Sequence, residues 1–182
     1  MLDLSIAYHR YRFLGDEFLT WLWHGIETRA ADLCALAPEI NAIEIADRMV
    51  IENRTGQSKE KITIKGDHAG LEEAKLALRK GAWVSEMALL LRTAEDEYRL
   101  TIRGENLNLS GMKIPSAAGG TSPEELETAF LERLDHLIKI TDFIDKIFYF
   151  YLSERISAKW KSLYLPSMRK WLVEDDEKKG AL

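Results

Sequence analysis

Residues 83–103, WVSEMALLLRTAEDEYRLTIR, decide the fold class of this chain. Two stretches rich in apolar and aromatic residues, 83–92 and 97–103, flank the polar segment 93–96. Strand-forming runs separated by a short polar segment are typical of a β-hairpin. The sequence therefore predicts two paired antiparallel strands here.

The region before this hairpin continues the sheet. Apolar residues occupy every second position in parts of 43–51 and in 61–65, as they do in half-buried strands. Asp47-Arg48 is expected to turn one strand into the next. Residues 53–60 are polar and contain a glycine, which favours a loop.

The region after the hairpin extends the sheet, and a helix is inserted before it. Leu107 and Leu109 are expected to continue the sheet edge. Residues 70–80 are rich in helix formers and are followed by Gly81, a good stop signal. Residues 40–110 thus predict a mostly antiparallel sheet of about five strands with one short helix, an α+β class.

The first helix is expected at 13–27, where apolar residues recur at spacings of three and four. Gly25 is expected to weaken or end it. Trp21 lies off the main apolar stripe, which predicts a helix buried on two sides. Trp21 and Trp23 are therefore interpreted as structural.

A long helix is expected to begin at Ser122-Pro123-Glu124-Glu125, because Ser122 can cap the free amides and Glu125 completes a capping box. Residues 116–121 before it are small and are interpreted as a linker. The helix is expected to run to Arg155 with a broad apolar face suited to a sheet, a bundle or a partner chain. Its heptad-like seam consists of Phe130, Leu134, Leu137, Thr141, Ile144, Phe148 and Tyr151.

A final helix is expected at 157–173, and Pro166 is expected to kink or split it. Residues 122–173 form the helical part of one domain, 1–173. Residues 174–182 are expected to be a polar, frayed tail.

Composition places the chain among globular proteins and predicts a cytoplasmic location without membrane contact. No apolar run approaches the ~20 residues that cross a bilayer, and the N-terminus lacks the features of a secretory signal. Cys34 is the only cysteine, so no intrachain disulfide can form. The net charge of −5 is opposite to that of a typical nucleic-acid-binding domain.

No catalytic, cofactor or metal site is predicted, and the chain is interpreted as a non-enzyme. The four histidines, His9, His24, His68 and His136, form no ligand pair. Cys34 lies among apolar residues, which favours an inert thiol. The glycines before Ser122 lack the lysine of a phosphate-binding loop. A hydrolase or nuclease stays open as a third hypothesis, to be revived by metal-dependent activity on DNA.

Two basic groups are the candidate nucleic-acid contacts. The first is Lys59, Lys61 and Lys65. The second mixes cations with aromatic residues, which can grip a phosphate backbone and stack bases, and consists of Lys159, Trp160, Lys161, Arg169, Lys170 and Trp171. The competing interpretation is an amphipathic helix that buries its tryptophans and hydrates its lysines.

Residues 14–23, LGDEFLTWLW, resemble a stretch that opens the C-terminal region of longer members of the bacterial recombination-associated protein RdgC family. The resemblance continues through 60–66 (EKITIKG), 78–81 (LRKG) and 107–111 (LNLSG), and ends near 165–172 (LPSMRKWL). It therefore follows most of the chain in order.

Membership of this family implies DNA binding by a ring-shaped dimer and a role in restraining recombination. The ring is built by the part that precedes this region, and only 13 residues precede Leu14 here. The resemblance therefore implies a free-standing accessory or interaction module of DNA recombination, which pairs with itself as a homodimer or with an RdgC-like partner. The alternative is a protein that binds nucleic acid directly through the Lys159 to Trp171 group.

Overall fold

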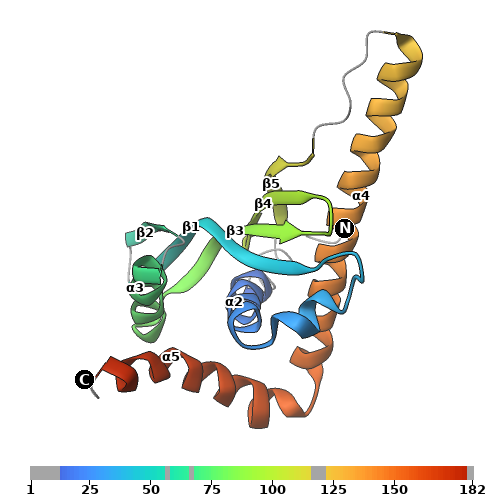
Figure 1. Cartoon of the computed structure of the whole chain (residues 1–182). Coiled ribbons are helices and arrows are strands. Elements are labelled where there is room, and N and C mark those ends of the chain that lie inside the picture. The colour runs from blue at the N-terminus through green and yellow to red at the C-terminus, as the bar shows by residue number, and fades with distance from the viewer. Residues whose placement is uncertain (1–12, 56–57, 66–67, 116–121, 180–182) are drawn as a thin grey trace, which may run out of the picture.

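The computed structural model describes residues 13–55, 58–65, 68–115 and 122–179. These residues form an α+β fold built on a five-stranded antiparallel sheet with the strand order β2-β1-β3-β4-β5 (Figure 1). The fold class predicted from the sequence is confirmed. The strands are β1 (Ala42–Thr55), β2 (Ser58–Lys65), β3 (Trp83–Arg92), β4 (Glu97–Arg103) and β5 (Asn108–Lys113).

The predicted hairpin is present as β3 and β4, with Leu89 paired to Leu100 in register. In β4 the buried side chains alternate with more exposed ones, since every second residue of a strand points to the same face. The backbone N–H of Thr93 donates to the carbonyl of Asp96 and closes the turn. Two strand-forming runs around a short polar segment therefore placed this hairpin correctly.

Two predictions about the neighbouring strands are wrong. Asp47 and Arg48 do not turn the chain, because β1 runs through them as one strand and absorbs them in a register shift between Ile45 and Met49. Such an irregularity bends a strand without ending it. The loop expected at 53–60 is also shorter, since β1 extends to Thr55 and β2 begins at Ser58; residues 56–57 lie outside the described residues.

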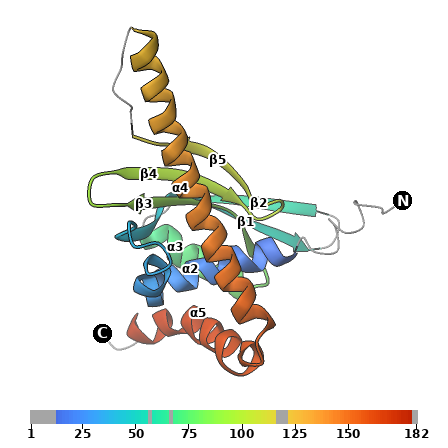
Figure 2. The ribbon, with the colours of Figure 1, turned by 90° about the vertical axis from the view of Figure 1, so that its right-hand side faces the viewer.

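The helices cover one face of the sheet and one of its sides (Figures 1 and 2). α2 packs on β1 and β3, α3 packs on β2 and β3, and α5 packs against α2 and α3. A π-helical turn, η1, connects α4 to α5. The helical elements are α2 (Phe13–Cys34), α3 (His68–Arg79), α4 (Pro123–Ile156), η1 (Trp160–Tyr164) and α5 (Leu165–Lys179).

The first helix is longer than predicted, because α2 continues past Gly25 to Cys34 with a kink at Arg29 (φ −151°, ψ 40°). Gly25 does not end the helix but allows the side chain of Leu33 to pack closely against it. A Cβ atom at this position would lie 3.2 Å from Cδ1 of Leu33, which packs back across the kink. The lack of a side chain lets the two parts of the helix approach each other.

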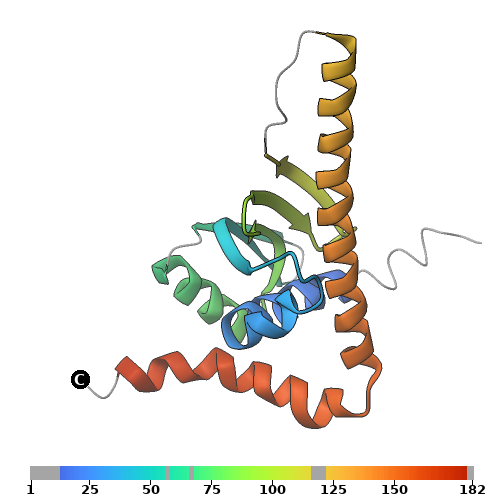
Figure 3. The same ribbon diagram turned by 45° about the vertical axis from the view of Figure 1, so that its right-hand side comes forward.

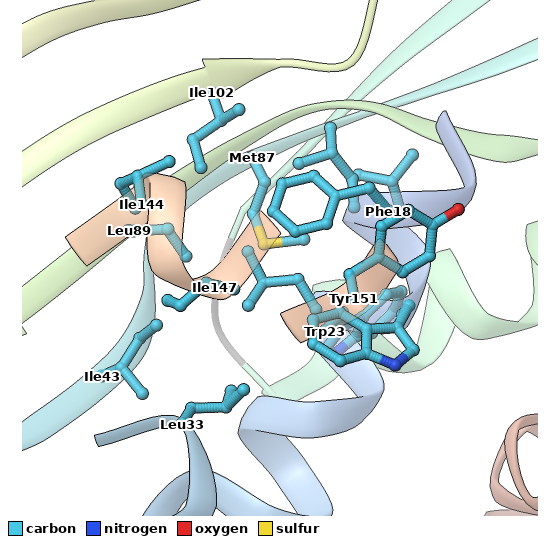
Figure 4. Close-up of a cluster of buried hydrophobic side chains, with 14 of the residues drawn as sticks. Phe18, Trp23, Leu33, Ile43, Met87, Leu89, Ile102, Ile144, Ile147 and Tyr151 are labelled. Atoms are coloured by element: carbon cyan, nitrogen blue, oxygen red, sulfur yellow. The ribbon is translucent and has the colours of Figure 1, made fainter. Parts of the chain in front are cut away.

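The hydrophobic core lies where the sheet, α2 and the second half of α4 meet (Figure 4). Trp21 and Trp23 are fully buried in it, as the sequence interpretation required. Aromatic rings pack edge-on or tilted around Tyr151, a favourable geometry for their quadrupoles. The core therefore draws on residues from both ends of the chain.

The C-terminal part departs from one continuous helix. η1 gives way to α5 at Leu165, immediately before Pro166, which matches the split expected from a residue without a backbone N–H. α5 then continues to Lys179, so residues 174–179 of the expected frayed tail are helical. The linker predicted at 116–121 lies outside the described residues. None of the helices described here combines the length and apolarity needed to cross a membrane.

Candidate functional site

The long helix α4 has two halves in different surroundings. Its C-terminal half packs into the core through side chains at spacings of three and four, the period of one helix face. Phe143 on this face is fully buried. The buried residues of the helix are Ile140, Phe143, Ile144, Ile147, Tyr151 and Glu154.

The N-terminal half, residues 123–139, projects beyond the sheet in every view and is called the arm (Figures 1, 2 and 3). None of its described residues is buried. It nevertheless carries large apolar side chains, and the most exposed, Phe130, keeps 64% of its surface in solvent. The exposed apolar residues of the arm are Leu126, Phe130, Leu131, Leu134 and Ile138.

The apolar face of the arm does not continue the buried face of the same helix. At about 100° per residue, the mean directions of the two sets differ by roughly 120° around the helix axis. The predicted seam therefore divides, with Ile144 and Tyr151 in the core and Phe130 and Leu134 exposed. The arm presents its apolar residues in a direction of its own.

The arm begins at a fully formed capping box, as predicted. The Ser122 hydroxyl accepts from the Glu125 amide at 3.2 Å, and the Glu125 carboxylate accepts from the Ser122 amide at 3.0 Å. Pro123 occupies the first helical position. These contacts satisfy amides that the helix itself leaves unpaired, so the projecting end is locally stabilised as a helix.

The arm is acidic, with five acidic and two basic residues and a net charge of −3. Lys139 pairs with Asp135 at 2.7 Å along the helix. Glu124, Glu127 and Glu132 are exposed. An apolar stripe with acidic surroundings is therefore available on this element.

The second predicted nucleic-acid group is divided by the structure. Trp160 and Trp171 are only 4% and 7% exposed, so their indoles are core residues that cannot stack on bases. The cations Lys159, Lys161, Arg169 and Lys170 are all exposed. This arrangement matches the competing interpretation, an amphipathic segment that buries its tryptophans. In the first group, Lys61 and Lys65 are exposed, and the side chain of Lys59 lies outside the described residues.

Glu27 explains the burial of Trp171. Its carboxylate accepts hydrogen bonds from the indole N–H of Trp23 at 2.6 Å and of Trp171 at 2.7 Å. The Lys75 ammonium donates to the same carboxylate at 2.8 Å and lies 5.0 Å from the centre of a Trp171 ring. One acidic residue thus joins α2, α3 and α5.

Glu154 has the same role between α2 and α4. This buried carboxylate accepts the indole N–H of Trp21 at 2.8 Å and both guanidinium N–H groups of Arg29 at 2.6 and 2.7 Å. Sequence reasoning missed this residue, although it follows Ile147 and Tyr151 at helical spacing on the buried face. An acidic residue at such a position indicates a buried ion pair.

Of the candidate histidines and cysteine, the structure describes the side chains of His24, His136 and Cys34, whereas His9 and the side chain of His68 lie outside the described residues. His24 is buried, and desolvation, with Arg29 nearby, lowers its pKa to about 4. Nδ1 of His136 lies 2.8 Å from the hydroxyl of Tyr98. Burial raises the pKa of the Cys34 thiol, which disfavours the reactive thiolate. Among the described residues, no three His, Cys, Asp or Glu side chains gather as a metal site requires.

The described surface thus includes the apolar and acidic arm, a feature suited to recognition. Comparison with known proteins adds no family to this description: no family model matches the chain, and no curated protein matches it.

Proposed function

We propose that this chain is a non-enzymatic interaction module and that the arm of α4 docks on a protein partner. The observation that carries the proposal is the row of five exposed apolar side chains on a helix that is capped and projects from the fold. Water-exposed apolar area is worth about 25 cal/mol per Å² when it is covered. A contiguous exposed patch of this kind marks interaction sites.

The alternative use of an apolar helix face is packing within its own domain, and the arm does not do this. The sheet and α2 pack against the other half of α4, and the arm's apolar face points about 120° away from that contact. The cap stabilises the first turn of the arm, and His136 near its other end contacts Tyr98 of β4. A preformed helix loses little conformational entropy on docking, which favours binding in the manner of a helix in a groove.

The resemblance of residues 14–23 to the RdgC family supports a place in DNA recombination. In this chain those residues supply the N-terminal part of the core, with Trp21 and Trp23 fully buried. The residues that carry the resemblance therefore belong to the core of the fold that positions the arm. On this basis the proposed role is that of an accessory module of recombination.

Site-specific photo-crosslinking in the native host tests this proposal. A photoreactive amino acid at Phe130 or at Leu134 is expected to give crosslinks to protein, because both side chains face the docking side. The matched control is Glu132, which is exposed on the opposite side of the same helix. Equal crosslinking at 130 and 132, or none at 130 and 134, would contradict the proposal. Recovery of a recombination protein in the crosslinked product would support the proposed context.

Direct nucleic-acid binding is kept as a second candidate because of the exposed cations. Residues 156–173 contain four basic residues and no acidic one. If this segment binds DNA, affinity should fall steeply with salt and fall further in a Lys161→Glu/Lys170→Glu variant. Fluorescence anisotropy with short duplex and single-stranded DNA measures both effects. The module proposal predicts no salt-sensitive binding in this assay.

A further inference from the structure

A second exposed surface of this chain complements the arm. It lies on the segment from the end of α4 through η1 to α5, where Ile156 is 84% exposed and Leu163 and Val173 are also exposed. On α5, Arg169, Lys170 and Val173 lie at helical spacing on one exposed side, opposite the buried Met168 and Trp171. We call the exposed charged and large apolar residues of this segment the basic face: Ile156, Lys159, Lys161, Leu163, Arg169, Lys170 and Val173.

The two surfaces have opposite charge and the same apolar character. The basic face belongs to a segment, 156–173, with four basic residues and no acidic one, whereas the arm has a net charge of −3. Both carry large exposed apolar side chains between their charges. Opposite charges at an interface raise the association rate and fix the orientation of the partners, while covered apolar area supplies affinity.

The arm cannot reach the basic face of its own chain. The two surfaces lie at opposite ends of α4, a helix of 34 residues that spans about 50 Å (Figure 3). An arm can therefore meet a basic face only on another copy of the chain, and two copies can meet in this way reciprocally. A two-fold axis relates the two contacts, and the assembly closes at two copies.

From this complementarity, and on the basis of the proposed function of the arm, we propose that its partner is a second copy of this chain, with each arm seated on the basic face of the other copy.

The exposed apolar area is sufficient for such a dimer. From their exposed fractions, the five arm side chains and the three on the basic face offer together roughly 800 Å² per chain, close to the about 800 Å² per partner of a stable interface. An arm paired only with another arm would cover less apolar area and would bring two surfaces of net charge −3 together. The reciprocal contact avoids both disadvantages.

Charge reversal on each surface tests this arrangement. One variant, Glu124→Lys/Glu127→Lys, changes the net charge of the arm from −3 to +1; the other, Lys159→Glu/Lys161→Glu/Arg169→Glu, changes that of the basic face from +4 to −2. Sedimentation velocity is expected to show a dimer for the wild type and monomers for each variant alone. An equimolar mixture of the two variants should dimerise again, because in the mixed pair both contacts join opposite charges.

The matched control is Asp32→Lys/Glu95→Lys, which makes the same change in net charge as the arm variant at exposed positions outside both surfaces and should remain dimeric. A monomeric wild type, a dimeric Lys159→Glu/Lys161→Glu/Arg169→Glu variant, or a mixture that stays monomeric would overturn the reciprocal dimer. The proposed function and this inference can fail separately. Crosslinks from Phe130 to a different protein would support the arm as a docking site and would contradict a second copy as its partner.

Discussion

The two halves of α4 both carry large apolar side chains and have opposite roles. Phe143 in the C-terminal half is fully buried in the core, whereas Phe130 in the arm is 64% exposed. The core holds one half, whereas the cap and the contact of His136 with Tyr98 support the other. The comparison teaches that the apolar pattern of a long helix shows which residues are suited to burial. The tertiary fold determines which of them are buried within the same chain.

The largest expected difference is between matched phenylalanine truncations on the two halves. Phe143→Ala should lower the free energy of unfolding by about 3–5 kcal/mol, because it removes a fully buried ring and leaves a cavity. Phe130→Ala should change it by less than about 0.5 kcal/mol at concentrations where the chain is monomeric. Urea unfolding measures both. Similar losses in the two variants would remove the distinction between the halves.

The next effect concerns Glu154, the carboxylate that ties the buried half to α2. Glu154→Gln should destabilise the fold by about 3 kcal/mol, since it leaves the Arg29 guanidinium partly buried without its counter-charge. Glu132→Gln on the arm is the matched control and should be close to neutral. An Arg29→Met/Glu154→Met double variant that recovers much of the loss would identify the unpaired charge as its cause.

A pH-dependent effect is expected from His24, on α2 beside α5. Its folded-state pKa of about 4 lies below the ordinary 6.5, so the unfolded chain takes up a proton first as the pH falls. His24 should therefore lower stability progressively between about pH 6.5 and pH 4. The difference in unfolding free energy between wild type and His24→Asn, measured across this range, isolates the contribution from the carboxylates. A constant difference would contradict the buried, neutral histidine.

The smallest global effect is expected at the cap of the arm. Ser122→Ala should cost the helix end about 1 kcal/mol and speed hydrogen exchange of the first arm amides about fivefold. The urea midpoint should stay unchanged, because the residues of the arm next to the cap are exposed and do not pack on the core. A clear fall in that midpoint would show that the two halves unfold together.

Local signals in the sequence located much of the fold. Ser122 and Glu125 predicted the start of α4, and the polar segment 93–96 between two strand-forming runs predicted the hairpin, because these patterns act over a few residues. The continuation of β1 through Asp47 and Arg48 could not be found in this way. It depends on pairing with β3, a strand distant in sequence.

The candidate site was predicted only in part, because burial is decided by distant partners. The apolar seam of α4 could be recognised in the sequence. The sequence did not indicate which half of the helix would be exposed. The sequence suggested that Trp171 is available for stacking on bases. In the structure its indole N–H donates to the carboxylate of Glu27, 144 residues away in the sequence. Lys159 and Lys161 are exposed, and their use as nucleic-acid contacts stays a prediction. The exposure of the acidic arm depends on where the fold places the two ends of α4.

Hydrogen exchange of the wild-type chain at low and high protein concentration tests the central claim most directly. Amides of the arm, 123–139, and of the basic face segment, 156–173, should slow together as concentration rises. Amides of the buried half around Phe143 to Glu154 should not change. Exchange of the arm at the same rate at every concentration, with or without slowing elsewhere, would contradict the account of the arm as the contact between two copies.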